Sequence, residues 1–77
     1  MKTVKFQNEA YKHYLEWEEV DKKIFKKIIE LIIDIDRDSF KGIGKPEPLK
    51  HQYKGFWSRR ISREHRLIYY ISPQKEI

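Results

Sequence analysis

One carboxylate in a strongly basic part of the chain is the first candidate for chemistry. Glu47 is the only acid between Asp38 and Glu64, and it lies between Pro46 and Pro48. A carboxylate can act as a general base where nearby cations hold the anion on which it acts. A loop glutamate among cations is more often a surface ion-pair partner, so both interpretations remain open at this point.

The cations around this carboxylate would suit a phosphodiester substrate. They are Lys45, Lys50, His51, Arg59, Arg60, Arg63 and Arg66. Cleavage without a metal needs a base, cations for the phosphate oxygens and an acid for the leaving oxygen. RNA brings its own nucleophile in the 2′-OH, so such a site can be small and free of cofactors. If the turn between the last two strands is centred on Arg63, Arg60 lies opposite Arg66, an arrangement that favours an anion between them.

The charge distribution also favours a substrate or partner that carries phosphates. The chain has 77 residues and a net charge of +5. Residues 1–38 hold eight Lys/Arg and nine Asp/Glu, whereas residues 39–77 hold nine Lys/Arg and three acids, a net charge of +6. Aromatic residues, 14% of the chain, are interleaved with these cations. Such a surface can bind phosphates and stack bases, although a solvated basic strand face over an aromatic core would have the same composition.

Several other kinds of site are disfavoured. There are no cysteines and the three histidines are scattered, so neither disulfides nor a dedicated metal centre is expected. The only closely spaced glycines are Gly42 and Gly44, too few for a nucleotide-binding loop. No serine lies in a nucleophile-elbow pattern. Because the sequence has no secretory or membrane-spanning stretch, we expect a cytoplasmic protein. We also expect that it uses no cofactor.

The first half of the chain predicts a short strand and two helices. Alternation over residues 3–6 indicates the strand. Asn8 is the expected N-cap of a helix to about residue 19, with Tyr11, Tyr14, Leu15 and Trp17 facing inward. Asp21 is the expected N-cap of a second helix, which should end near Arg37. Its apolar stripe is Ile24, Ile28, Leu31, Ile32 and Ile35, and its outer, exposed face includes Glu30 and Asp34.

The second half predicts a loop and a β-hairpin. Residues 41–48 contain two glycines and two prolines, which favour an extended loop. Strands are expected over residues 56–61 and 66–71, with the turn at residues 62–65, where His65 should be exposed. The prediction is one α+β domain over residues 1–77, with two N-terminal helices packed on an antiparallel sheet.

Two sequence blocks resemble a known family. They are Gly42-Ile43-Gly44-Lys45-Pro46-Glu47-Pro48-Leu49-Lys50-His51 and Gly55-Phe56-Trp57-Ser58-Arg59-Arg60-Ile61, the latter followed by Glu64-His65-Arg66-Leu67. These blocks are similar to those of the Txe/YoeB toxins of the RelE superfamily, and the similarity covers essentially the whole chain. The resemblance implies a microbial-ribonuclease-like fold and the toxin of a type II toxin–antitoxin system.

The resemblance also implies an activity and roles for individual residues. The family's toxins cleave messenger RNA in the ribosomal A site, are neutralised by a YefM-type antitoxin and can form homodimers. By this resemblance the catalytic base is Glu47, and Arg60 and Arg66 stabilise the charged phosphate. The residues that it implies for RNA binding are Lys45, Lys50, His51 and Arg59. The expected product is a 2′,3′-cyclic phosphate or its opened form.

One departure from the family pattern affects the expected activity. Family members continue into a last strand that ends in a His-Tyr pair, whose histidine is the presumed general acid. Neither His51 nor His65 occupies that position, so we expect this 77-residue form to be a weakened endoribonuclease. The alternative function is a non-catalytic module that binds RNA, the ribosome or an antitoxin.

The missing-acid hypothesis can be tested with an extended chain. Addition of a strand ending in His-Tyr after Ile77 should raise the cleavage rate by ~10²- to 10⁴-fold, the usual contribution of a general acid. The measurement is cleavage of mRNA on purified ribosomes, with the same extension ending in Ala-Ala as the control. Equal rates for the extended and unextended chains would refute the hypothesis.

Overall fold

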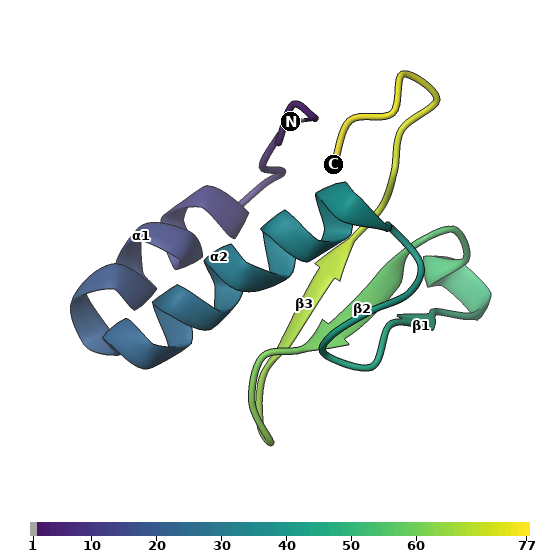
Figure 1. Cartoon of the computed structure of the whole chain (residues 1–77). Coiled ribbons are helices and arrows are strands. Elements are labelled where there is room, and N and C mark those ends of the chain that lie inside the picture. Colours follow the sequence, from purple (N-terminus) through teal and green to yellow (C-terminus); the bar gives the residue numbers. More distant parts are fainter. Residues whose placement is uncertain (1) are drawn as a thin grey trace.

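Two helices pack on one face of a small antiparallel sheet (Figure 1). The computed structural model describes residues 2–77. The elements are α1 (Ala10–Val20), α2 (Lys22–Arg37), β1 (Glu47–Pro48), a 3₁₀ turn η1 (His51–Tyr53), β2 (Trp57–Arg60) and β3 (Arg66–Tyr69). The predicted α+β class is therefore confirmed. None of the described helices is long and apolar enough to cross a bilayer.

Helix α2 supplies most of the core. The Asp21 side chain caps its first turn, accepting hydrogen bonds from the backbone N–H groups of Lys23 (3.0 Å) and Ile24 (3.3 Å). This confirms the predicted N-cap, and the helix ends at Arg37 as expected. The buried residues of its apolar stripe are Ile28, Leu31 and Ile35. The 3.6-residue period of the stripe therefore predicted the face that meets the sheet.

Helix α1 differs from the prediction at its start and on its inner face. It begins one residue after Glu9, and Asn8 has a left-handed φ of 52° rather than the geometry of a cap. Tyr14 is half-buried, and its ring lies 4.9 Å from that of Phe25 on α2. Tyr11 and Leu15, which were expected to face inward, are exposed. Only a narrow side of α1 reaches α2, because most of α1 lies beyond the edge of the sheet (Figure 1).

The sheet has the order β1-β2-β3, with both pairs antiparallel. The hairpin of β2 and β3 confirms the predicted turn, and the strands are somewhat shorter than predicted. The third strand was predicted wrongly. Residues 3–6 do not join this sheet as a strand, and its third strand is instead β1, from the proline-rich loop. Two-residue strands carry no periodic signal, so β1 could not be read from the sequence.

A buried arginine joins the sheet to α2. The Arg59 side chain is 0% exposed, and its Nη1 donates to Asp34 Oδ2 at 2.5 Å. Its Nε donates to the Tyr69 hydroxyl at 3.1 Å, and its remaining N–H groups reach the backbone carbonyls of Asp38, Ile43 and Lys41. Every donor of the guanidinium therefore has a partner, as a buried charge requires.

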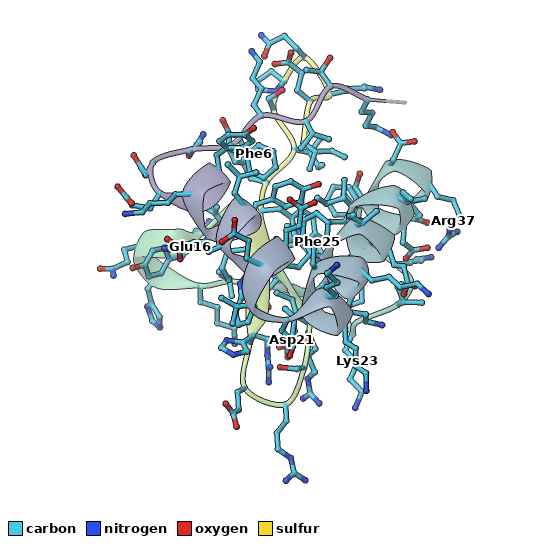
Figure 2. The ribbon with its side chains drawn as sticks, turned by 90° about the vertical axis from the view of Figure 1, so that its left-hand side faces the viewer. Phe6, Glu16, Asp21, Lys23, Phe25 and Arg37 are labelled. Atoms are coloured by element: carbon cyan, nitrogen blue, oxygen red, sulfur yellow. The ribbon has the colours of Figure 1, made fainter. Side chains whose placement is uncertain are left out.

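Asp34 is the acceptor on which this network converges. It also accepts from Arg37 Nε (2.9 Å) and from the backbone N–H of Ile43 (3.0 Å). The hydrogen bond from Arg37 lowers the pKa of Asp34 from 3.8 to about 2, with Arg59 and Ile43 also lowering it and burial opposing them. The prediction that Asp34 is exposed was wrong, since its side chain is 15% exposed. Figure 2 shows Arg37 on the outer side of α2.

Gly44 brings the proline-rich loop close to both layers. Its carbonyl accepts a 2.6 Å hydrogen bond from the backbone N–H of Arg60. A Cβ here would lie 2.8 Å from Leu31 Cδ2 and 3.0 Å from the Arg60 carbonyl oxygen, and φ is +79°. Only glycine fits this position without strain. The glycine thereby fixes the path of the chain just before Glu47.

Replacement of Asp34 by Asn should unfold much of the population. The change leaves the buried Arg59 guanidinium without a counter-charge, a defect that costs about 3–5 kcal/mol. Urea denaturation at pH 7 measures the loss, with Glu30→Gln, an exposed position on the same helix, as the control. A loss no larger than that of the control would contradict a structural role for the pair.

The contribution of Asp34 should also depend on pH. Its folded-state pKa lies below the unfolded value, so its ionised form stabilises the fold above pH 3.8. That stabilisation is lost as the pH falls from 3.8 toward about 2. The difference in unfolding free energy between the unaltered chain and Asp34→Asn should shrink over this interval. A difference that stays constant would contradict the lowered pKa.

Gly44→Ala should be destabilising by roughly 1–3 kcal/mol, because it adds both backbone strain and a clash. Gly55→Ala is the matched control, since Gly55 also has a positive φ (+100°) but no atom within 4 Å of its would-be Cβ. Thermal or urea unfolding should show a larger loss of unfolding free energy for Gly44→Ala than for Gly55→Ala, because only Gly44→Ala adds a clash to the backbone strain. A smaller loss for Gly44→Ala than for the control would overturn this explanation.

Candidate active site on the open face of the sheet

The strand registers decide which candidate side chains share a face. Glu47 pairs with Ser58 across β1 and β2, and Ser58 pairs with Ile68 across β2 and β3. Side chains directly opposite one another project from the same face of a sheet, and residues two apart along a strand do so as well. Glu47 therefore shares a face with Arg60, two residues beyond Ser58. This shared face is turned away from α2. The side chain of Arg59 projects from the opposite face, toward α2.

Arg60 and Arg66 are directly opposite each other, as expected for a turn centred on Arg63. Both residues are exposed. Nη1 of Arg66 donates to carbonyls of the preceding turn, those of Ser62 (2.9 Å), Arg63 (3.3 Å) and His65 (3.1 Å). The turn thus holds one end of this guanidinium in place. Two adjacent cations on an exposed face form a site for an anion, because an anion between them removes their mutual repulsion.

The candidate base lies one strand away from this pair of arginines. Glu47 is exposed, and across residues 2–77 no ion pair within 4.0 Å joins it to Arg60 or Arg66. The arrangement brings a carboxylate and two guanidinium groups to one open face, with Ser58 between them at 7% exposure. No role was predicted for Ser58.

The remaining predicted cations lie around Glu47 in the chain. Lys45, Lys50 and His51 are all exposed. Lys45 and His51 have positive φ values of 51° and 58°, so sharp bends of the backbone stand on both sides of β1. Their assignment to RNA binding stays a prediction from the sequence.

Arg59 is a correction to the predicted set. We expected an RNA contact there, but its guanidinium is buried and fully hydrogen-bonded beneath the sheet. A buried, satisfied group cannot reach a ligand on the open face. The signal was present in the alternation of Trp57, Arg59 and Ile61, which places the arginine on the apolar face of the strand. Its role is to attach β2 to α2 through Asp34.

His65 also differs from the prediction. The residue was expected to be exposed in the turn, yet it is half-buried and its ring centroid lies 4.8 Å from that of Trp17 on α1. The contact ties the β2–β3 turn to the first helix. The turn whose carbonyls accept hydrogen bonds from Arg66 is therefore packed against α1 through the contact of His65 with Trp17.

The part of the chain described by the structure contains no group of three or more His, Asp or Glu side chains placed to hold a metal. The residues that the strand registers bring to the open face are one carboxylate, Glu47, and two guanidinium groups, Arg60 and Arg66.

Comparison with known proteins gives consistent results. Residues 6–77 match the family model described as "YoeB-like toxin of bacterial type II toxin-antitoxin system". The chain is 59% identical to Toxin YoeB of Escherichia coli K12 over 64 residues, 83% of this chain and 76% of that protein.

Solved structures agree in fold. The chain has a TM-score of 0.88 and 43% identity to a heterotetrameric YoeB–YefM toxin–antitoxin complex from Staphylococcus aureus, covering 95% of this chain and 85% of that one. It has a TM-score of 0.86 and 44% identity to a YoeB dimer from the same species, with 92% and 83% covered. On the family match, the sequence identity and the shared fold together, this chain belongs to the YoeB-like toxins of bacterial type II toxin–antitoxin systems.

Proposed function

We propose that the chain is a ribosome-dependent mRNA endoribonuclease that cleaves by acid–base chemistry through the 2′-OH. The observation that carries this proposal is the common open face of Glu47, Arg60 and Arg66, given by the strand registers. RNA is the substrate that needs no nucleophile from the protein. A site made of one carboxylate and two guanidinium groups is therefore chemically sufficient for the first half of the reaction.

In the proposed step, Glu47 accepts the proton of the 2′-OH, and the resulting oxygen nucleophile attacks the adjacent phosphorus. The P–O5′ bond breaks, leaving a 2′,3′-cyclic phosphate on one fragment and a 5′-oxygen on the other, which takes up a proton from water. Arg60 and Arg66 stabilise the negative charge that builds on the phosphate oxygens. Because the two arginines stand directly opposite each other, one phosphate can contact both guanidinium groups at once.

The exposed cations around Glu47 are assigned to binding. Lys45, Lys50 and His51 would contact phosphates flanking the scissile bond, and their contribution to affinity should fall with salt because phosphate binding releases counterions. The catalytic set is small and open, which suits a substrate presented by a larger particle. The resemblance to the Txe/YoeB toxins implies mRNA in the ribosomal A site as the substrate, and we assign this substrate, with the cytoplasm as the place of action.

The protein partners follow from the relatives. The Staphylococcus aureus relatives are solved as a complex with YefM and as a dimer. We propose that a YefM-type antitoxin binds this chain and that the chain can form a homodimer. The net charge of +6 over residues 39–77 favours an antitoxin segment that brings acidic side chains to the open face.

The alternative is a non-catalytic module with the same surface. It is favoured by one observation, that no ion pair within 4.0 Å holds the Glu47 carboxylate near Arg60 or Arg66 in the described chain. In this alternative, Glu47 is only a surface residue, and the cations bind RNA, the ribosome or an antitoxin without cleavage.

Glu47→Gln separates the two functions. The amide keeps the shape of the side chain but cannot take the proton, so ribosome-dependent cleavage should fall by ~10²- to 10⁴-fold while ribosome binding is retained. Primer extension on a defined mRNA measures cleavage, and sedimentation with 70S ribosomes measures binding. Glu64→Gln, an exposed acid in the hairpin turn, is the matched control. Cleavage unchanged by Glu47→Gln would favour the binding module.

A further inference from the structure

The turn that joins β2 to β3 at one end of the hairpin (Figure 1) is closed by a serine hydroxyl. The Ser62 Oγ accepts hydrogen bonds from the backbone N–H groups of Glu64 (3.3 Å) and His65 (3.2 Å). A serine that bonds two and three residues ahead in this way fixes the backbone of a turn. The His65 carbonyl closes the turn from the other side, since it accepts from the backbone N–H groups of Ile61 (3.0 Å) and Ser62 (3.3 Å).

Three carbonyl groups of this turn converge on one nitrogen of Arg66. Its Nη1 donates to the carbonyl oxygens of Ser62 (2.9 Å), Arg63 (3.3 Å) and His65 (3.1 Å). The Arg63 carbonyl and the Glu64 N–H belong to one planar peptide unit, in which they point in opposite directions. The hydrogen bond from Glu64 N–H to the Ser62 hydroxyl therefore also directs the Arg63 carbonyl toward Arg66. The hydroxyl thus sets the geometry of the turn that holds the guanidinium.

The hydrogen bonds to the turn leave one edge of the Arg66 guanidinium available to an anion. Within residues 2–77, the Arg66 side chain donates only through Nη1, so Nε and Nη2 have no acceptor there. These two nitrogens lie on one edge of the planar group and can donate two parallel hydrogen bonds to the oxygens of a phosphate. Because neutral carbonyls hold Nη1, the guanidinium also keeps its positive charge. Arg66 therefore presents a donor edge in a fixed orientation on the open face.

Arg60, the other arginine of the open face, has no such support. Within residues 2–77, the side-chain hydrogen bonds donated by arginines belong to Arg37, Arg59 and Arg66. An exposed arginine without partners keeps its rotamer freedom and loses it only when it binds an anion. The two guanidinium groups of the anion site therefore differ. Arg66 is oriented before a phosphate binds, whereas Arg60 becomes ordered on binding.

We propose that Ser62 is a positioning residue for Arg66, which keeps the Nε–Nη2 edge of the guanidinium in the orientation that a phosphate requires. The Ser62 hydroxyl acts through the turn and does not itself contact the substrate. A donor that is already oriented stabilises the charge of a transition state without reorganisation during the reaction. His65, whose ring centroid lies 4.8 Å from that of Trp17, keeps the turn against α1. The effect of Ser62 on cleavage rests on the proposed function, whereas its effect on the mobility of Arg66 does not.

The first test needs no enzymatic activity. Heteronuclear NOE measurements on the arginine Nε–H groups of the 77-residue chain report how mobile each side chain is. We expect Arg66 to be more rigid than Arg60. Ser62→Ala should remove this difference, because it deletes both turn hydrogen bonds, and Ser62→Thr should preserve it, because threonine keeps the hydroxyl. Equal mobility in the unaltered chain, or an Arg66 that stays rigid in Ser62→Ala, would overturn the proposal. If Ser62→Ala fails to fold, the unaltered chain and Ser62→Thr decide.

The second test measures cleavage of mRNA on purified ribosomes. Ser62→Ala should lower kcat by ~10- to 100-fold with KM little changed, because a misdirected catalytic group loses mainly transition-state stabilisation. Ser62→Thr should restore kcat, and Ser62→Ala should have no further effect in an Arg66→Ala background.

Ser72→Ala is the matched control, since it also removes a hydroxyl that accepts a turn N–H, that of Glu76 (3.0 Å), and it should leave kcat unchanged. A loss from Ser62→Ala that persists in full in the Arg66→Ala background would overturn the positioning role. Failure of the unaltered chain to cleave would contradict the proposed function instead, and the mobility measurement would then decide the role of Ser62 by itself.

Discussion

The ion pair of Arg59 with Asp34 is the interaction on which the rest of the structure depends. It is the main polar link between β2 and α2, and its carbonyl partners extend it to the segment that leads into the proline-rich loop. A charge buried this completely is tolerated only because every donor is satisfied. The pair fixes the position of the proline-rich loop relative to the sheet, and thereby the position of Glu47. A small domain with few fully buried apolar residues relies on such a link.

The two arginines at the end of β2 have opposite roles because adjacent strand residues point to opposite faces. Arg59 is committed to the interior, whereas Arg60 is exposed opposite Arg66. The Arg-Arg motif is therefore not a doubled binding element. One residue holds the strand against the helix, and the next presents its charge on the surface that the first has positioned. Gly44 in the preceding loop also has a packing role, since the loop there approaches Leu31 and Arg60 too closely for a side chain.

The sheet has two unequal edges. At one edge, β1 carries the candidate base and ends the sheet with two residues and a proline, which limits further pairing. At the other, β3 lies beside a cavity lined largely by apolar residues, and among residues 2–77 the outward backbone groups of Ile68 have no backbone partner.

The sequence by itself determined the class of fold, the second helix with its Asp21 cap and the hairpin, because capping, periodicity and turn position are local signals. It offered the pairing of Arg60 with Arg66 only for a turn centred on Arg63, and the structure supplied that register. Residue types also marked Glu47 and its basic neighbours as the candidate site. Only the tertiary structure decided that β1 joins the sheet, that Arg59 and Asp34 are buried together, and that Tyr11 and Leu15 remain exposed. These outcomes depend on which surfaces meet in the folded chain, as where Asp34 meets Arg59 25 positions further on, and neither two-residue strands nor single charged residues encode that in a local pattern.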